Sequence, residues 1–426
     1  MTAHQVQWLF LGLVAILTLS GLFGAAARRL GQPAVVGEIL AGILIGPSLF
    51  GGAVADALLP ADIRPALTAL ANLGLALFMF AIGYELRFAE LRGRSGLAVR
   101  VSVFSVALPF VLGVLLALGI AGAHPVRSRA GFVLFLGAAM SVTAFPVLAR
   151  ILADRGLDRT RLGGVALAGA ALSDLFAWGL LGLAVTVAGA AGQQRMLLVP
   201  VYLAVMSLGV RPLLKRVFAG ADEHGVSPAM IGALLVALLL SCWATEWMGI
   251  HFIFGAFLLG AIAPRGGRRD LSTEVTGRFE AVSGLLLPAY FVLAATRVNL
   301  AEVGLSGIGE LALILLTAVI GKFAGAYAGA RVSAVPKLQS AALATLMNAR
   351  GLTEIVILTV GLQLAVIDTQ LYSLLVVMAL VTTAMAGPVL QLLERRAGGD
   401  ARRLGDFEYD HQSLGSVPRI SSKTGM

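Results

Sequence analysis

Apolar stretches long enough to cross a bilayer follow one another along almost the whole chain of 426 residues. A membrane-spanning helix needs about 20 mostly apolar residues. Charged residues make up only 13% of the chain, about half of their usual share in soluble proteins. A water-soluble fold of this length needs more polar surface, so the composition excludes a soluble enzyme, a nucleic-acid-binding domain and a disordered chain. We therefore expect an all-α, polytopic membrane protein whose surface meets a lipid bilayer.

Polar breaks divide the apolar sequence into thirteen expected transmembrane helices. They cover residues 7–27, 33–50, 65–86, 101–122, 130–153, 162–190, 194–214, 227–247, 249–264, 281–296, 305–330, 338–363 and 369–392. The first stretch has no Lys or Arg before Arg28 and is longer than the apolar part of a signal peptide, so we expect it to remain as a span. Residues 1–392 would then form one transmembrane domain, and residues 393–426 a short, disordered cytoplasmic tail.

Lys and Arg residues lie mostly on one side of the expected membrane. Of the 32 Lys and Arg residues, 25 lie in alternate loops and in the C-terminal tail, and five lie in the loops of the opposite side. The other two, Lys322 and Arg350, lie inside spans. Because basic residues concentrate in cytoplasmic loops, the pattern predicts a multi-pass protein of the inner or plasma membrane, with its N-terminus outside and its C-terminus in the cytoplasm. The net charge of +9 thus reflects topology and not a nucleic-acid partner.

Two of the expected spans are interrupted by polar residues at the depth of the hydrocarbon. The fifth contains Met140-Ser-Val-Thr-Ala-Phe-Pro146, and the twelfth contains Met347-Asn-Ala-Arg-Gly-Leu-Thr-Glu354. Proline removes a backbone donor and glycine favours non-helical dihedral angles, so both helices are expected to break there. The two spans are seven apart and therefore enter the membrane from opposite sides. This pattern is typical of inverted repeats, which we place at about 7–190 and 227–392, around a linker helix at about 194–214.

Polar and ionisable side chains gather at the same depth as the two breaks. At about 1.5 Å per residue, Thr143, Asp174, Lys322 and Asn348 each lie roughly 13 to 19 Å from an end of their span. A charge at this depth is costly, so Asp174 and Lys322 should pair with each other or face a water-filled cavity. Such a pair is either part of a transport site or a structural link between two helices.

Two further patterns predict packing at this depth. Arg350 and Glu354 are four residues apart, so they can pair on one helix face and satisfy backbone carbonyls freed at the break. We expect these two residues, with Asn348, to support the crossing of the broken helices. Small residues spaced by four also predict a close helix contact beside Lys322: Gly321, Gly325 and Gly329.

Four sequence motifs resemble those of the monovalent cation:proton antiporter-2 family, in the sodium/hydrogen exchanger superfamily. They are Gln32-Pro-Ala-Val-Val-Gly-Glu-Ile-Leu-Ala-Gly-Ile-Leu-Ile-Gly-Pro-Ser-Leu49, Ser141-Val-Thr-Ala-Phe-Pro-Val-Leu-Ala-Arg150 with Ile151 and Leu152, the segment from His251 to Gly260 with its Gly-Ala-Phe-Leu-Leu-Gly, and the segment from Met347 to Glu354. The resemblance runs from about residue 10 to residue 392. It implies a sodium/proton antiporter fold of thirteen helices, a homodimer, and a mobile core domain made of spans four to six and eleven to thirteen.

The resemblance also implies roles for single residues. Asp174 is similar to the family's cation- and proton-binding aspartate, and Lys322 to the basic residue that faces it. Ser141 and Thr143 lie where the crossing contributes oxygen atoms to the cation. Ser173 stands where relatives commonly carry Asp, Asn or Gln, so the family's two-carboxylate scheme does not carry over, and we expect Ser173 to supply a hydroxyl oxygen instead.

The expected function is exchange of a monovalent cation, Na⁺ or K⁺, for protons by elevator-like alternating access. Both ions would compete for Asp174, and no cofactor or enzymatic activity is implied. If Asp174 and Lys322 form a neutral pair that the cation disrupts, with Lys322 releasing its proton, exchange is one for one and electroneutral. The alternatives are an exporter of a non-alkali cation or small molecule, a channel-like uniporter on the same fold, and an enzyme or sensor that reuses the scaffold.

Overall fold

The computed structural model describes residues 2–85, 95–125, 128–157, 160–187, 195, 198–219, 225–248, 251–264, 271–301, 303–398 and 404–405. Within these ranges every regular element is a helix. The helices are α1 (Ala3–Arg29), α2 (Ala34–Ile45), α3 (Pro47–Phe50), α4 (Ala53–Leu58), α5 (Arg64–Glu85), α6 (Ser95–Ile120), α7 (Arg129–Ser141), α8 (Phe145–Asp154), α9 (Arg161–Val187), α11 (Val199–Ala204), a π-helical segment (Val205–Val210), α12 (Arg211–Val217), α14 (Pro228–Trp247), α15 (Phe252–Ile262), α16 (Leu271–Ala295), α17 (Leu305–Val332), α18 (Lys337–Met347), α19 (Leu352–Gln363) and α20 (Thr369–Arg396).

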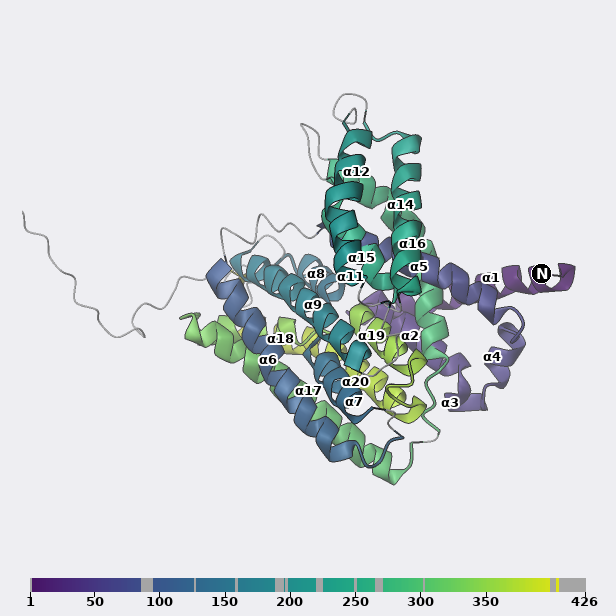
Figure 1. The fold of residues 1–426 in the computed structure, drawn as a ribbon. Helices are drawn as coiled ribbons and strands as arrows, with labels where there is room; N and C mark the ends of the chain where they lie inside the picture. The colour runs from purple at the N-terminus through teal and green to yellow at the C-terminus, as the bar shows by residue number, and fades with distance from the viewer. Residues whose placement is uncertain are drawn as a thin grey trace, which may run out of the picture.

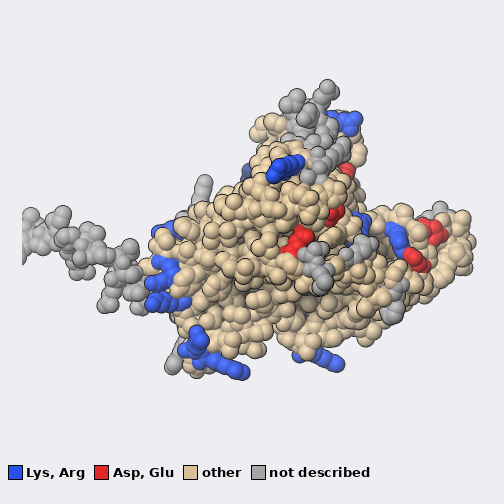
Figure 2. Space-filling view, turned by 90° about the horizontal axis from the view of Figure 1, so that it is seen from below, with Lys and Arg blue, Asp and Glu red and all other residues tan. Residues whose placement is uncertain are grey.

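The described helices confirm the all-α membrane architecture. Eight of them are long and apolar enough to cross a membrane, and four shorter helices are apolar as well. Each of the thirteen expected spans coincides with one helix or with a consecutive set of helices. Broad uncharged areas of the surface, with charged side chains in small groups, are visible in Figure 2.

Some expected boundaries were wrong. The second span is divided, because Gly46 ends α2 with an extended conformation and a separate short helix, α3, follows it. The tenth begins at Leu271, ten residues before the expected start, because polar residues continue the helix and Arg278 donates to Glu274 across one turn at 2.7 Å. The last helix continues to Arg396, and most of the tail that was expected to be disordered lies outside the described residues.

The helices pack in two groups (Figure 1). In the first, which we call the panel group, α5 packs against α15 and α16, α2 packs against α1 and α16, and α14 packs against α15. In the second, which we call the crossover group, α6 packs against α17, α7 and α9, while α18 and α20 pack against α17. The two broken spans, α7–α8 and α18–α19, both belong to the crossover group.

Glycine allows the close contact between α6 and α17. A Cβ on Gly325 would lie 2.4 Å from the carbonyl oxygen of Phe104, and one on Gly329 would lie 2.9 Å from that of Arg100. A Cβ on Gly321 would lie 3.0 Å from the Cα of Pro109. The expected packing role of these three glycines is confirmed, because no larger residue fits without a shift of the α6 backbone.

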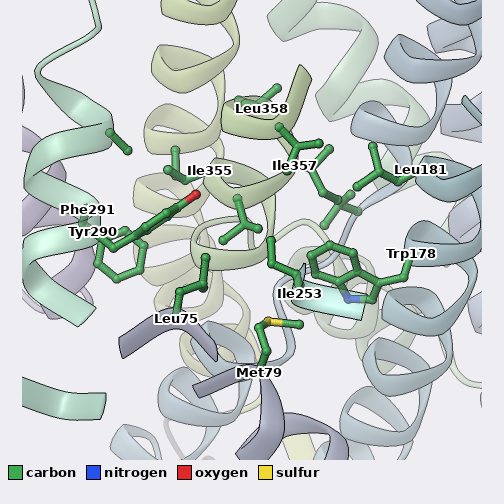
Figure 3. Close-up of a cluster of buried hydrophobic side chains, with 14 of the residues drawn as sticks. Leu75, Met79, Trp178, Leu181, Ile253, Tyr290, Phe291, Ile355, Ile357 and Leu358 are labelled. Carbon is green, nitrogen blue, oxygen red and sulfur yellow. The ribbon is translucent and has the colours of Figure 1, made fainter. Parts of the chain in front are cut away.

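An apolar seam separates the two groups over part of their contact surface (Figure 3). Its side chains are all buried, and they come from α5, α15 and α16 on the panel side and from α9 and α19 on the crossover side. They are Leu75, Met79, Ile253, Tyr290, Phe291, Trp178, Leu181, Ile355, Ile357 and Leu358. Beside the seam, two hydrogen bonds join the start of α20 to the end of α16 and the segment after it: Tyr372 Oη donates to Ala294 O at 2.9 Å, and Asn299 N donates to Ser373 Oγ at 2.9 Å.

Candidate functional site

The two broken helices meet at their breaks. The backbone N–H of Ala144 donates to Ala349 O at 3.0 Å, and Thr143 Oγ1 donates to Met347 O at 3.0 Å. Gly351 starts the second half of its helix with φ 154° and ψ −117°, a conformation that residues with a Cβ rarely adopt. The expected breaks are therefore present, and they bring four half-helix ends to one place.

Arg350 occupies the C-terminal end of α7. Its Nη1 atom donates to Ala139 O at 3.0 Å and its Nη2 atom donates to Met140 O at 2.7 Å. The same Nη1 atom donates to both carboxylate oxygens of Glu354, at 2.6 and 2.9 Å, and both side chains are fully buried. The last carbonyls of a helix lack intrahelical donors and carry the negative end of its dipole. The guanidinium therefore satisfies these carbonyls, as expected for a residue that supports the crossing.

Lys322 also lies at the end of α7. Its Nζ atom donates to Ser141 O at 2.5 Å, to Thr143 Oγ1 at 2.6 Å and to Ser105 Oγ at 3.4 Å. An ammonium group has three protons to donate, so each has an oxygen acceptor. Ser105 was not among the predicted site residues, and the only signal for it in the sequence is weak: Ser102 and Ser105 lie one turn apart in the otherwise apolar span of α6.

Asp174 lies at the start of the next half-helix. Its side chain is 2% exposed, and it accepts a hydrogen bond from the backbone N–H of Phe145, the first residue of α8. Its Oδ1 atom has no hydrogen-bond partner among the described residues. A carboxylate is favoured at a helix N-terminus by the backbone N–H groups and the positive end of the dipole.

The expected ion pair between Asp174 and Lys322 is not formed in the described part of the chain. The physical reason is that the break supplies each charge with its own partner. The ammonium lies against carbonyl and hydroxyl oxygens where α7 ends, and the carboxylate lies against an N–H group where α8 begins. The two charges can therefore be buried near each other without direct contact.

Among the remaining site residues, two serines have hydrogen-bond partners for their hydroxyl groups and one asparagine has an oxygen without a partner. Ser173 Oγ donates to Gly169 O at 2.9 Å and lies 3.2 Å from Ser102 Oγ. Ser141 Oγ lies 2.8 Å from Gly137 O in its own helix and 3.1 Å from Val106 O of α6, and its one proton is shared between these two carbonyls. Ser141 therefore offers Lys322 its backbone oxygen and not its hydroxyl. Asn348, next to the contact between the broken helices, has a buried Oδ1 atom without a partner among the described residues. Asp174 Oδ1 and Asn348 Oδ1 are thus the side-chain oxygens near the crossing that are left to accept a ligand.

Comparison with known proteins agrees with this geometry. Residues 14–395 match the family described as "Sodium/hydrogen exchanger, transmembrane". The chain belongs to the sodium/hydrogen exchanger family. This membership confirms the family resemblance carried by the four sequence motifs.

Relatives of this exchanger-family chain cover most of its length. It is 36% identical over 403 residues to the "Na(+)/H(+) antiporter NhaS4" of Synechocystis, an alignment that spans 92% of this chain and 98% of the relative. It is 35% identical to "Cation/H(+) antiporter 20" of Arabidopsis thaliana over 95% of its own length and 50% of the relative's, so it spans about half of that protein.

The fold is also that of a solved structure. The sodium proton antiporter MjNhaP1 of Methanocaldococcus jannaschii superimposes with a TM-score of 0.63 at 16% identity, over 98% of this chain and all of that one. At this identity the likeness shows a common fold. It confirms the expected antiporter fold, and the two broken spans that cross are seen in the structure itself.

Proposed function

We propose that this chain exchanges Na⁺ or K⁺ for protons across a membrane, with Asp174 as the group that both ions bind. The observation that supports this most directly is the buried and unpartnered Oδ1 atom of Asp174 at the start of α8. A dehydrated alkali cation needs oxygen ligands, and a proton needs the same carboxylate. The relatives' names, which describe sodium or cation exchange for protons, agree with this proposal.

Lys322 and the cation would also compete for the same oxygen atoms, in addition to the competition of cation and proton for Asp174. Its ammonium is bound to Ser141 O, Thr143 Oγ1 and Ser105 Oγ, which are three oxygens that an alkali cation could use. A cation that binds between Asp174 and these oxygens must move the ammonium away from them. Lys322 would then lose three hydrogen bonds and release its proton, so cation binding and proton release are coupled through shared ligands.

The site would be carried by the crossover group as it moves past the panel group in an elevator-like transition. Three features support this: both broken helices lie in one group, the seam between the groups is apolar, and few polar contacts cross it in the described residues. Along α9 the seam residues Trp178 and Leu181 follow Asp174. The protein would lie in the plasma membrane with its N-terminus outside and its C-terminus in the cytoplasm. In this orientation α9 runs outward, so the seam would lie between the site and the outside. We further propose that the protein works as a homodimer.

Proton flux in proteoliposomes tests the function. Vesicles containing the purified protein and a pH indicator are given Na⁺, K⁺ or Li⁺ separately, and the same is done with Asp174→Asn. We expect at least one cation to drive proton movement in the wild type and none to do so in the variant, because an amide neither titrates nor carries a full negative charge. Cation-driven flux of equal rate in the folded variant would refute the site, and absence of flux with all three cations would refute the function.

A further inference from the structure

Two buried polar atoms on α9 lack partners among the described residues, and they are complementary. Asp174 Oδ1 is an acceptor, and Trp178 Nε1 carries a donor. Asp174 is 2% exposed and Trp178 is 4% exposed, so neither side chain is hydrated from the surface. A buried donor or acceptor that is left unpaired destabilises the state in which it occurs.

The two residues share one face of the helix. They are four positions apart, and side chains at this spacing are neighbours on a helix surface. Long side chains on a helix lean toward its N-terminus and cover the preceding turn, which for Trp178 is the turn that carries Asp174. Figure 3 draws the indole with its nitrogen on the ring edge that is turned away from Leu181, the next seam residue along α9.

The indole also forms part of the seam with the panel group. It packs edge-on against Phe254 of α15, with ring centroids 5.6 Å apart and an interplanar angle of 84°. Ile253 of α15 and Met79 of α5 belong to the same apolar cluster. The orientation of Trp178 therefore depends on how the panel group lies against α9, and the spacing of four residues places Trp178 on the helix face that carries Asp174.

We propose that Trp178 is a positioning residue of the exchange site, whose indole N–H donates to the Asp174 carboxylate in a cation-free state and is displaced by the entering cation. The proposal rests on the proposed function, in which Asp174 binds the cation. An indole N–H donates only, so it cannot bind a cation. It instead competes with the cation for the same oxygen, and it connects occupation of the site to packing at the seam.

The first test compares the cation concentration that gives half-maximal exchange in Trp178→Phe and in the wild type. Phenylalanine keeps an aromatic ring at the seam and lacks the N–H. We expect the half-maximal concentration to fall roughly tenfold, as for loss of one hydrogen bond to a charged group. Trp243→Phe is the matched control, because Trp243 is 63% exposed on α14. A half-maximal concentration that is unchanged or raised in Trp178→Phe would overturn the proposal.

The second test does not depend on a variant at position 178. Trp8, Trp243 and Trp247 are replaced by Phe, so that Trp178 is the single tryptophan. On cation titration we expect its fluorescence to change with the same midpoint as cation binding measured by calorimetry, and Asp174→Asn to abolish the change. Calorimetric binding without a fluorescence change would overturn the role of Trp178. No binding of any alkali cation would overturn the proposed function, and this inference with it.

Discussion

At the scale of single residues, the site shows how a membrane interior holds isolated charges. Lys322 and Asp174 lie at opposite sides of one helix break, one against backbone carbonyl and hydroxyl oxygens and the other against a backbone N–H. Each charge is stabilised by the half-helix end of opposite polarity. Thr143 is central to this arrangement, because its hydroxyl accepts from Lys322 and donates to Met347 O.

Replacement of Thr143 by Ala should therefore weaken cation binding without unfolding the protein. The variant removes one acceptor of Lys322 and one of the expected cation ligands. The bond from Ala144 N to Ala349 O and the two bonds from Arg350 to the end of α7 remain. We expect the half-maximal cation concentration in the proteoliposome assay to rise several-fold. Thr345→Ala is the control, because its hydroxyl donates only within α18, to Ala341 O. An equal effect of both variants would contradict a role in the site.

A second charged cluster, in which His124 itself lies outside the spans, predicts how stability depends on pH. His124, after the end of α6, is 6% exposed, and its two nitrogens lie 2.7 Å from Asp368 Oδ2 and 2.7 Å from Glu310 Oε1. Hydrogen bonds to Asp368 and Glu310 raise the pKa of His124 from 6.5 to about 9. Because the folded state holds the proton more tightly than the unfolded state, protonated His124 stabilises the fold. This stabilisation is complete below the unfolded pKa and is lost as the pH rises through about 9.

We expect the thermal stability of the wild type to fall between about pH 7 and about pH 10, by roughly 3 kcal/mol at most from this residue. His124→Gln should be less stable than the wild type at the lower pH, and its stability should not show the decrease that comes from deprotonation of His124. His4→Gln is the control, because His4 is exposed near the N-terminus. Thermal unfolding in detergent across this pH range measures the effect, and parallel curves for wild type and His124→Gln would contradict it.

Much of the site could be predicted from the sequence, because a charge in an apolar span is costly and therefore conspicuous. Asp174, Lys322, Arg350 and Glu354 were all found in this way. The partner of each charge was harder to predict. Lys322 donates to oxygens at the crossing and not to Asp174, and this depends on the three-dimensional course of the break. Ser105 carries no charge that would have singled it out in the sequence.

At the scale of elements, the contact between α6 and α17 determines whether the site can form. Ser105 on α6 reaches Lys322 on α17 at 3.4 Å. The helices come this close because Gly325 presents no side chain to the backbone of α6 at Phe104. Close packing of this kind is a common way for transmembrane helices to associate, since lipid offers no hydrophobic driving force between them.

Substitution of Gly325 by Ala should separate the two helices. The new Cβ would meet Phe104 O at 2.4 Å, and overpacking of this kind typically costs about 1 to 3 kcal/mol. We expect a lower unfolding temperature in detergent and a loss of exchange, because Ser105 moves away from Lys322. Gly309→Ala on the same helix is the control, because a Cβ there meets nothing within 4 Å. A Gly325→Ala variant as stable and active as this control would disprove the packing argument.

The order and number of elements were more predictable than their ends. Apolar length and polar breaks placed each expected span on one helix or on consecutive helices of the described chain, because backbone groups in lipid must be satisfied within helices. Boundaries failed where helices continue past the apolar stretch into water, as α16 does at its start. Hydropathy cannot detect these turns, since their residues are polar and stabilised by contacts such as that between Glu274 and Arg278.

At the scale of the whole molecule, the net charge of the site determines whether a transport cycle would move charge across the membrane. If the cation displaces the ammonium of Lys322, this residue loses its proton and Asp174 stays ionised throughout, the site has no net charge with or without the cation, and one-for-one exchange is electroneutral. If Asp174 also takes up a proton when the cation leaves, one net charge moves per cycle. Sodium uptake into proteoliposomes at zero and at about −100 mV tests this, because about 2.3 kcal/mol per charge is available at that voltage. A several-fold change in rate or end point would contradict electroneutral exchange.

The proposed orientation makes a separate prediction for accessibility. In a Cys242→Ser background, a cysteine introduced at Asp62, in the exposed loop before α5, should react with an impermeant thiol reagent added outside intact cells. A cysteine introduced at Arg396, exposed at the end of α20, should react only after the membrane is permeabilised. Both are measured by gel-shift labelling, and the reverse pattern would show that the orientation is inverted.

The contact between the broken helices has a consequence for the order in which the protein is made. The end of α7 depends on Arg350, and Ala144 N bonds to Ala349 O, although some two hundred residues separate these partners in the chain. The first repeat therefore enters the membrane before the groups that satisfy its broken helix have been synthesised. A ribosome-bound chain that ends before residue 350 would hold the end of α7 without the guanidinium that satisfies the carbonyls of Ala139 and Met140. The exchange site is thus completed only once the break in the second repeat has been synthesised.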